Sequence, residues 1–455
     1  MIVKRLIEEK LVAWKDSRHR KALIVRGARQ VGKTYSIENF GRDHFDDVLV
    51  VDLEKHKSWH RIFSGDIGAS QVLSELELET DHRIQPGRTL LFLDEVQACP
   101  RAIVALRYLY EECPELHVVA AGSLLEFALG EISVPVGRVE FLTMHPMTFV
   151  EYLWAAGRER AAELVLAPPR PLSEVAHQVL LEELRRYCLI GGMPASVLAY
   201  TRTQSLHEAM KVHGTLCEGF RQDFSKYAPR ADPACLDEVF TGLARCMGQQ
   251  LKYTRLAENY AGESIKRAFS LLRKARLVAR VAAANPSGLP LGASASGRRL
   301  KAILLDVGLW QHLCGMKADI AHTKTDLLDV YRGALAEQFV GQEMLVSQES
   351  ELYYWSRQAP SSTAEVDYLA VVDGEIVPVE VKSGPAGRLR SLHLLLETYP
   401  NCPRGLVFSS APYAEDPEHK LTFLPLYFAY SATKSREPSE LPFGEPSSAD
   451  RNEED

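Results

Sequence analysis

The stretch Gly27–Thr34 constrains the fold of this chain more than any other part of the sequence. It reads G-x-x-x-x-G-K-T, it follows the apolar run Ala22–Val25, and a helical pattern comes directly after it. The apolar run is typical of a buried parallel strand, so the order is strand, glycine loop and helix. The glycines let the backbone bend until successive N–H groups point at one bound anion, and the helix N-terminus adds a positive end. The alternative is a chance match in a glycine-containing turn.

The residue types in this loop predict the phosphate site of a nucleotide hydrolase. Lys33 supplies a mobile positive charge for the β- and γ-phosphates, and Thr34 places a hydroxyl on Mg²⁺. We therefore expect ATP and Mg²⁺ as cofactors. The predicted nucleotide-binding residues are Gly27, Ala28, Arg29, Gln30, Val31, Gly32, Lys33, Thr34 and Asp94.

Composition and charge bound the class of protein. The 455 residues are 46% hydrophobic and 25% charged, which predicts a soluble globular protein of roughly two to four domains. A formal charge of -7 argues against wholesale coating of nucleic acid or membrane, but it is compatible with a local basic surface. The N-terminus is rich in charge, no apolar run is long enough to span a bilayer, and none of the eight cysteines forms a C-x-x-C pair. We expect a cytoplasmic protein with reduced thiols and no membrane partner.

Two carboxylates end a later predicted strand. The stretches 47–52 and 89–95 both read as strands, and Asp94 and Glu95 come at the C-terminal end of the second. Ligands of open α/β sheets lie off that end of the strands. Asp94 is therefore predicted to help to hold Mg²⁺, and Glu95 to orient and polarise the attacking water. The alternative is an ordinary exposed strand end.

Ser123 and Arg138 are two further catalytic candidates. A fourth strand, 117–123, ends at Ser123, whose hydroxyl could position water or could act as the N-cap of the following helical turn. Both roles are compatible with each other. Arg138 lies at the end of that helical stretch, just before strand character resumes at 139–142.

These motifs occur in the order found in AAA-type ATPases, and together they resemble a widespread prokaryotic family that joins an AAA ATPase to a C-terminal domain of unknown function. The resemblance implies that Arg138 is an arginine finger for the nucleotide of a neighbouring subunit, and hence that the chain self-associates. A plain surface arginine is the alternative, and no lid arginine can be assigned. The resemblance rests on Gly27–Thr34, Leu91–Glu95, Gly122-Ser123, Gly137-Arg138 and Gly191–Pro194.

The middle of the chain reads as helical. The proline-rich stretch Ala167–Pro171 marks a domain boundary, and an amphipathic pattern over 180–187 leads to Gly191–Pro194. These last four residues predict a flexible turn. It acts either as a hinge between the ATPase and a partner domain or as a plain connector of two helices.

A helix-turn-helix pattern at 253–274, followed by strands at 277–281 and 300–305, resembles a winged helix. A basic face on its second helix would suit DNA phosphates, although winged helices also serve as spacers. The core-facing residues of that helix have i, i+3, i+4, i+7 spacing: Ile265, Ala268, Phe269 and Leu272. The basic residues lie mostly off that stripe: Lys266, Arg267, Arg273 and Lys274.

The last region contains a predicted hairpin with opposed carboxylates. Asp373-Gly374 between two strand-like runs is a strong two-residue turn pattern. The register that it sets places Asp367 opposite Glu380, with Lys382 on the same face. Opposed carboxylates repel each other, and a divalent ion would remove that penalty while Lys382 orients or activates a water.

The elements around this hairpin follow the order α-β-β-β-α-β, over 331–345, 352–355, 364–372, 375–382, 388–397 and 405–408. The first helix carries Glu337 on a small and apolar face, where an unpaired carboxylate is costly. The whole resembles the PD-(D/E)xK nuclease core, which implies Glu337, Asp367 and Glu380 as ligands of a second divalent ion and Lys382 as a catalytic residue. Glu365-Val366-Asp367 departs from the usual Pro-Asp pair. The alternative is a salt-bridged hairpin in a decayed nuclease fold that binds a partner.

The sequence thus predicts an α/β protein in four parts. These are an AAA-type P-loop ATPase domain at 1–165, a helical region at 172–325 with a winged helix at about 235–306, a nuclease-like domain at 326–430, and a disordered acidic tail at 431–455. The predicted function is ATP binding and hydrolysis coupled to action on nucleic acid, with DNA as a partner. The alternatives are an ATP-dependent switch and a DNA-binding regulator, neither of which cuts.

Overall fold

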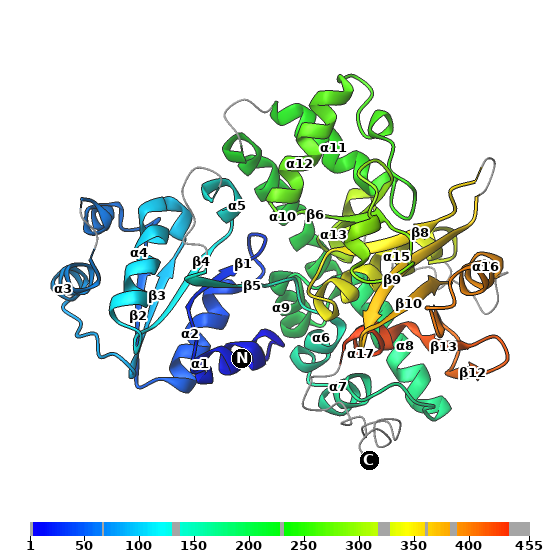
Figure 1. The fold of residues 1–455 in the computed structure, drawn as a ribbon, viewed down its shortest axis with the longest axis horizontal. Helices are drawn as coiled ribbons and strands as arrows, with labels where there is room; N and C mark the ends of the chain where they lie inside the picture. Colours follow the sequence, from blue (N-terminus) through cyan, green and yellow to red (C-terminus); the bar gives the residue numbers. More distant parts are fainter. Residues whose placement is uncertain are drawn as a thin grey trace, which may run out of the picture.

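The computed structural model describes residues 3–65, 68–129, 137–227, 232–316, 328–359, 363–382 and 389–435. This part of the chain forms two bodies (Figure 1). A five-stranded sheet with its helices makes the N-terminal body, and an eight-stranded sheet with the remaining helices makes the second. Both bodies are α/β, as the sequence predicts. No helix of the described residues is long and apolar enough to cross a membrane.

The N-terminal body is built on a sheet of order β2-β3-β4-β1-β5, whose paired strands are all parallel. The five strands lie where the sequence predicts them: β1 (Ala22–Arg26), β2 (Asp47–Asp52), β3 (Thr89–Asp94), β4 (His117–Gly122) and β5 (Val139–Thr143). The helices are α1 (Ile7–Asp16), α2 (Lys33–His44), η1 (Lys57–Phe63), α3 (Ala69–Thr80), η2 (Val96–Ala98), α4 (Pro100–Glu112) and α5 (Leu125–Ala128).

Alternate residues of the central strands face opposite helical layers. In β3, Leu90 and Phe92 pack with α1 and α2, whereas Leu91 and Leu93 pack with α3 and α4. Every residue of β3 is buried, as expected of a parallel strand that is covered on both faces. Because the strands run in one direction, the loops that follow them all lie at one edge of the sheet.

The second body is built on a mixed sheet of order β12-β13-β11-β10-β9-β8-β6-β7. Its strands are β6 (Val278–Ala283), β7 (Leu300–Leu304), β8 (Leu352–Ser356), β9 (Glu365–Val372), β10 (Glu375–Val381), β11 (Gly405–Ser409), β12 (Ala414–Asp416) and β13 (Leu421–Pro425). Helix α15 (Leu328–Ser347) packs on one face, and α16 (Arg390–Thr398) packs on the other. The predicted α-β-β-β-α-β order is present from α15 to β11. Sequence reasoning missed β12 and β13.

The hairpin β9–β10 has the predicted register. Asp373 and Gly374 form its turn with positive φ angles of 52° and 81°, which a type I′ turn requires. The pairing runs from Glu375 opposite Val372 to Val379 opposite Tyr368, and the next pair in this register is Glu380 and Asp367.

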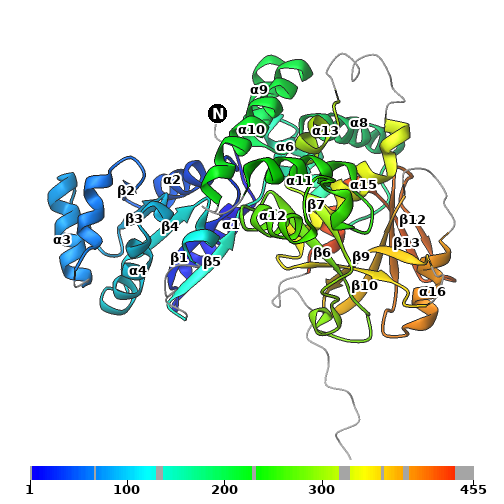
Figure 2. The same cartoon turned by 90° about the horizontal axis from the view of Figure 1, so that it is seen from above.

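Helices fill the rest of the second body. They are α6 (Phe149–Ala155), α7 (Glu159–Leu166), α8 (Glu174–Ile190), α9 (Pro194–Thr203), α10 (Leu206–Tyr227), α11 (Pro233–Arg245), η3 (Tyr253–Arg255), α12 (Gly262–Lys274), η4 (Leu291–Ser294), α13 (Val307–Leu313), η5 (Leu426–Phe428) and α17 (Ala429–Thr433). Figure 2 shows α10 and α12 on the side of this body that faces the N-terminal body.

Elements of the structure pack across the three predicted boundaries. Helices α6 and α7, which precede the boundary predicted near 165, pack against α8, α9 and α17 of the second body. Strand β6 pairs with β8, so one sheet crosses the boundary predicted at 325/326. The tail is predicted to begin at 431, but α17 continues to Thr433, whose side chain is fully buried. Residues 436–455 lie outside the described part of the chain.

The region predicted as a winged helix has its elements in the expected order. The core-facing residues of α12 are confirmed as buried: Ile265, Ala268, Phe269 and Leu272. The first predicted helix is a single 3₁₀ turn, η3. The hairpin β6–β7 is not a free wing, because β6 also pairs with β8.

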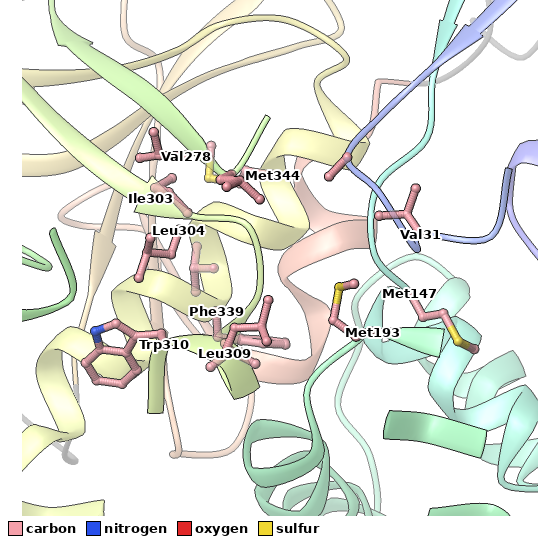
Figure 3. Packing of buried hydrophobic residues seen from close by; sticks show 14 of the residues in the cluster. Val31, Met147, Met193, Val278, Ile303, Leu304, Leu309, Trp310, Phe339 and Met344 are labelled. Atoms are coloured by element: carbon pink, nitrogen blue, oxygen red, sulfur yellow. The ribbon is translucent and has the colours of Figure 1, made fainter. Parts of the chain in front are cut away.

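One hydrophobic core runs through the joint between the two bodies. Figure 3 shows Val31 of the glycine loop, Met147 of the connecting segment and Met193 beside one another, with Phe339 and Met344 of α15 further into the second body. All five side chains are buried. The glycine loop therefore rests on the packed interior of the second body.

Gly191 and Gly192 lie in this joint, and they are not the flexible turn that the sequence predicts. The Gly192 N–H donates to Asp306 Oδ2 at 2.5 Å, and its carbonyl oxygen accepts from Met147 N at 2.6 Å. A Cβ at Gly192 would overlap the carbonyl oxygen of Met147 and lie 2.9 Å from the hydroxyl of Tyr187. Gly192 is thus required by close backbone contact.

We predict that Gly192→Ala lowers the free energy of unfolding by about 1–3 kcal/mol, because the methyl group has no room. Gly219→Ala is the control, since Gly219 lies in α10 with no atom within 4 Å of its would-be Cβ. Alanine there should raise stability by about 0.5–1 kcal/mol. Calorimetric unfolding temperatures of both variants test this. An unchanged midpoint for Gly192→Ala would contradict the tight joint.

Candidate functional site

The glycine loop leaves β1 and enters α2 at the edge of the sheet where the strands end. Gly32 is the N-cap of α2 and has a φ of 97°, which an L side chain rarely adopts. A Cβ at Gly27 would overlap the carbonyl oxygen of Met144, at the exit of β5. Both glycines of the motif are therefore required by the backbone, in agreement with an anion-binding loop.

Lys33 lies folded over its own loop. Its Nζ donates to the carbonyl oxygens of Gly27 at 3.1 Å and Ala28 at 2.8 Å. Burial lowers the pKa of Lys33 to about 8, against the opposing charges of Glu95 and Asp94. An anion bound in the loop would form an ion pair with the Lys33 ammonium group.

Two hydrogen bonds connect Thr34, Asp94 and Glu95. Thr34 Oγ1 donates to Asp94 Oδ2 at 2.7 Å, and Asp94 Oδ1 accepts from the Glu95 N–H at 2.9 Å. Burial raises the pKa of Asp94 to about 6. A hydroxyl beside a carboxylate is the oxygen donor set that Mg²⁺ takes in such loops, so these residues fit the ion.

Glu95 is held in an uncommon backbone conformation. Its φ and ψ are 47° and 45°, in the left-handed region, which is rare for a residue other than glycine. Its carboxylate accepts a hydrogen bond from Gln97 Nε2. Strain of this kind is found at functional sites, and here it turns the carboxylate toward the cavity beside the loop.

A cavity of about 490 Å³ lies over the loop. Its lining includes a residue of the second body, Lys226 of α10. The lining residues are Arg29, Gln30, Gly32, Lys33, Thr34, Tyr35, Glu54, Glu95, Ser123 and Lys226.

Arg29 connects the loop to the second body. Its Nε donates to Ser123 Oγ at 3.2 Å, and its guanidinium pairs with Asp223 of α10. Asp223 Oδ1 also forms an ion pair with Lys226 Nζ at 3.1 Å. Ser123 thus lines the cavity, while the N-cap of α5 is Leu124 rather than Ser123. Sequence reasoning missed Asp223 and Lys226, because only the fold brings α10 to the loop.

Arg138 lies away from this cavity. It precedes β5, which runs parallel to β1, so it is at the edge of the sheet opposite to the glycine loop. Its Nε pairs with Glu111 Oε1 of α4 at 2.8 Å, and its side chain is 45% exposed. A role at the nucleotide of another subunit remains a prediction.

The four C-terminal candidates gather at one end of the hairpin β9–β10. Asp367 Oδ2 accepts from the Val381 N–H at 2.8 Å, and Glu380 Oε1 pairs with Lys382 Nζ at 2.5 Å. Glu337 lies beside them on α15. Burial, with a smaller contribution from the charge of Asp367, raises the pKa values of Glu337 and Glu380 to about 7.

A lysine that sequence reasoning missed lies among these carboxylates. Lys301 of β7 places Nζ 2.8 Å from Glu337 Oε1, 2.6 Å from Glu365 Oε1 and 3.5 Å from Asp367 Oδ1. Within the described ranges, no group of three or more His, Cys, Asp and Glu side chains is arranged to hold a metal ion. As placed, the predicted ligands Glu337, Asp367 and Glu380 do not fit a second divalent ion, because ammonium groups already bind them.

The basic face of α12 is only partly free. Lys266, Arg267 and Lys274 are exposed, as predicted, whereas Arg273 pairs with Glu351 at 3.6 Å.

Comparison with known families defines the class of the N-terminal body. Residues 19–153 match the family model described as an AAA domain. Residues 181–320 and 332–427 match two models that are each described as a domain of unknown function (DUF8612 and DUF4143). With its parallel sheet and glycine loop, the N-terminal body is an AAA-type P-loop ATPase domain. No curated protein matches the chain.

The chain has partial similarity to two solved structures. A Walker-type ATPase of Pyrococcus abyssi is 14% identical, and the match covers 69% of this chain and 96% of that one at a TM-score of 0.43. The Aeropyrum pernix ORC1 protein in complex with DNA is 11% identical, with coverage of 69% and 94% and a TM-score of 0.30.

Arg138 is expected to act across a subunit interface. Arg138→Ala and Glu95→Gln should each lose ATP turnover alone and recover part of it when mixed, because some interfaces then pair an intact Glu95 with an intact Arg138. Arg107→Ala is the control, since Arg107 is the other partner of Glu111, at 3.2 Å, and it should keep full turnover. Phosphate release from co-assembled subunits is the measurement, and absence of recovery would contradict a finger acting between subunits.

Proposed function

We propose that this chain is an ATP-dependent switch, in which the nucleotide at the glycine loop controls how the second body docks on the ATPase domain. The observation that carries the proposal is Lys226, a residue of the second body that lines the nucleotide cavity. In the proposed reaction, Lys33 binds the phosphates, Thr34 and Asp94 hold Mg²⁺, and Glu95 polarises the attacking water.

The charges around Asp223 explain how a nucleotide could be sensed. Asp223 binds Arg29 from the loop and Lys226 from its own helix, so one carboxylate holds two cations that line the cavity. When bound, ATP supplies a γ-phosphate charge that ADP lacks. Lys226 can be drawn toward that charge, which adds a contact between α10 and the bound ATP. A ligand shifts a conformational equilibrium only by its differential affinity for the two states, and Lys226 can supply that difference only while α10 is docked.

We expect Lys226→Ala to reduce the preference for ATP over ADP by about fivefold or more, as for a modest coupling free energy. Lys211→Ala is a matched control. Lys211 lies on the same helix, is 59% exposed against 58% for Lys226, and pairs with Glu208 three residues before it. Isothermal titration with both nucleotides measures the preference, and Lys33→Ala provides the baseline without binding. An unchanged preference in Lys226→Ala, or an equal loss in Lys211→Ala, would contradict the proposal.

Nucleic acid is the partner that we propose for this switch, supported by the exposed Lys266, Arg267 and Lys274 of α12. Contacts of these side chains with phosphates would release counterions, so affinity should fall steeply with salt. The double variant Lys266→Glu/Arg267→Glu should bind duplex DNA at least about tenfold more weakly, with a smaller salt dependence. Equal binding by the variant in a fluorescence anisotropy titration would remove this face from the proposal.

DNA cleavage at the C-terminal carboxylates is the competing function. It would need a divalent ion beside Asp367 and Glu380, with Lys382 acting on a water. The position of Lys301 favours the switch, because its ammonium group already pairs with Glu337 and Asp367.

A further inference from the structure

The carboxylate cluster of the second body is assembled from three elements. Glu337 comes from α15, Glu365 and Asp367 from β9, and Glu380 from β10. Like charges at such short range repel one another strongly in a poorly solvated site, so the cluster requires a cation.

Lys301 meets this requirement. Its strand, β7, is buried throughout, and the Lys301 side chain is 2% exposed. The ammonium group contacts Glu337, Glu365 and Asp367, and it lies 5.3 Å from the centroid of the Tyr354 ring. A buried ammonium group without partners would be very costly, whereas three carboxylates compensate it.

The electrostatics agree with a charged lysine at this position. Burial by itself would lower the pKa of Lys301, but Glu337, Asp367 and Glu365 together raise it above its usual range.

A second observation points to a cation site larger than the lysine fills. Glu380 is 7% exposed, and its Oε2 atom is buried without a hydrogen-bond partner among the described residues. Its other oxygen pairs with Lys382. The cluster therefore contains a buried carboxylate oxygen that neither lysine contacts within hydrogen-bond distance.

We propose that the Lys301 ammonium group takes the place of a divalent cation in this cluster, and that removing it uncovers a latent divalent-ion site formed by Glu337, Asp367 and Glu380. Oxygen ligands from carboxylates are those that hard divalent ions take. No residue of the nucleotide cavity takes part, so this inference stands or fails separately from the proposed switch.

The test uses the full chain without nucleotide and Mn²⁺ as the probe. In wild type, the loss of free Mn²⁺ signal in electron paramagnetic resonance should be the same with and without Asp367→Asn, whereas Lys301→Ala should bind one more ion per chain than wild type. Its unfolding temperature should then rise with Mn²⁺ concentration, because the ion binds only the folded state. Adding Asp367→Asn to Lys301→Ala should abolish both effects.

A second variant distinguishes the loss of the Lys301 charge from the loss of its side-chain volume. Lys301→Met removes the charge but keeps most of the side-chain volume, so it should be less stable than wild type and respond less to Mn²⁺ than Lys301→Ala. Mn²⁺ binding by wild type that is lost in Asp367→Asn would overturn the inference, and so would folded Lys301→Ala that binds no Mn²⁺.

If Lys301→Ala folds only when Mn²⁺ is added, the inference is supported. If it does not fold even with Mn²⁺, the wild-type titration decides: Asp367-dependent binding refutes the inference and its absence supports it.

Discussion

The buried guanidinium of Arg5 holds the nucleotide loop to the rest of the protein. It donates to the Val31 carbonyl oxygen at 2.8 Å, to the His145 carbonyl oxygen at 2.8 Å and to Glu151 Oε1 at 2.9 Å. Glu151 is also the N3 residue of a capping box that begins α6 at Thr148. One arginine thus joins the loop, the exit of β5 and the first helix of the second body. Removing either partner of such a buried pair would leave an uncompensated charge.

Buried polar contacts also join α6 to α15, the helix that packs on the second sheet. The Phe149 N–H donates to Glu343 Oε1 of α15 at 3.0 Å, and burial raises the pKa of Glu343 to about 8. The same helix carries Glu337, the partner of Lys301. The nucleotide cavity and the carboxylate cluster are therefore attached to one frame of buried polar contacts. A second attachment, from Arg29 to Asp223 on α10, lies at the cavity itself. Arg5 holds the loop in place through buried hydrogen bonds, whereas the charge of a bound nucleotide can alter the ion pair between Arg29 and Asp223.

Local patterns were sufficient for much of this fold. The apolar run of β3 ending in Asp94 and the Asp373-Gly374 turn are set by neighbours in the chain, so their strands and register could be predicted. Contacts between distant segments could not, because Arg29 and Asp223 are 194 residues apart and no pattern links them. For Lys301 there was an indication: a lysine within the apolar run Leu300–Leu304 must find buried partners. The predicted metal site overlooked that lysine, and the packing of α6 against α8 and α9 had no local signal in the sequence.

Backbone amide exchange in α10 tests most directly whether the nucleotide controls the docking of the second body. Glu95→Gln with ATP should show slower exchange at the C-terminal end of α10 than the same protein with ADP, because a docked Lys226 protects that turn. Adding Lys226→Ala should remove the difference between the two nucleotides. Equal exchange with ATP and ADP, in protein shown to bind both, would contradict the account.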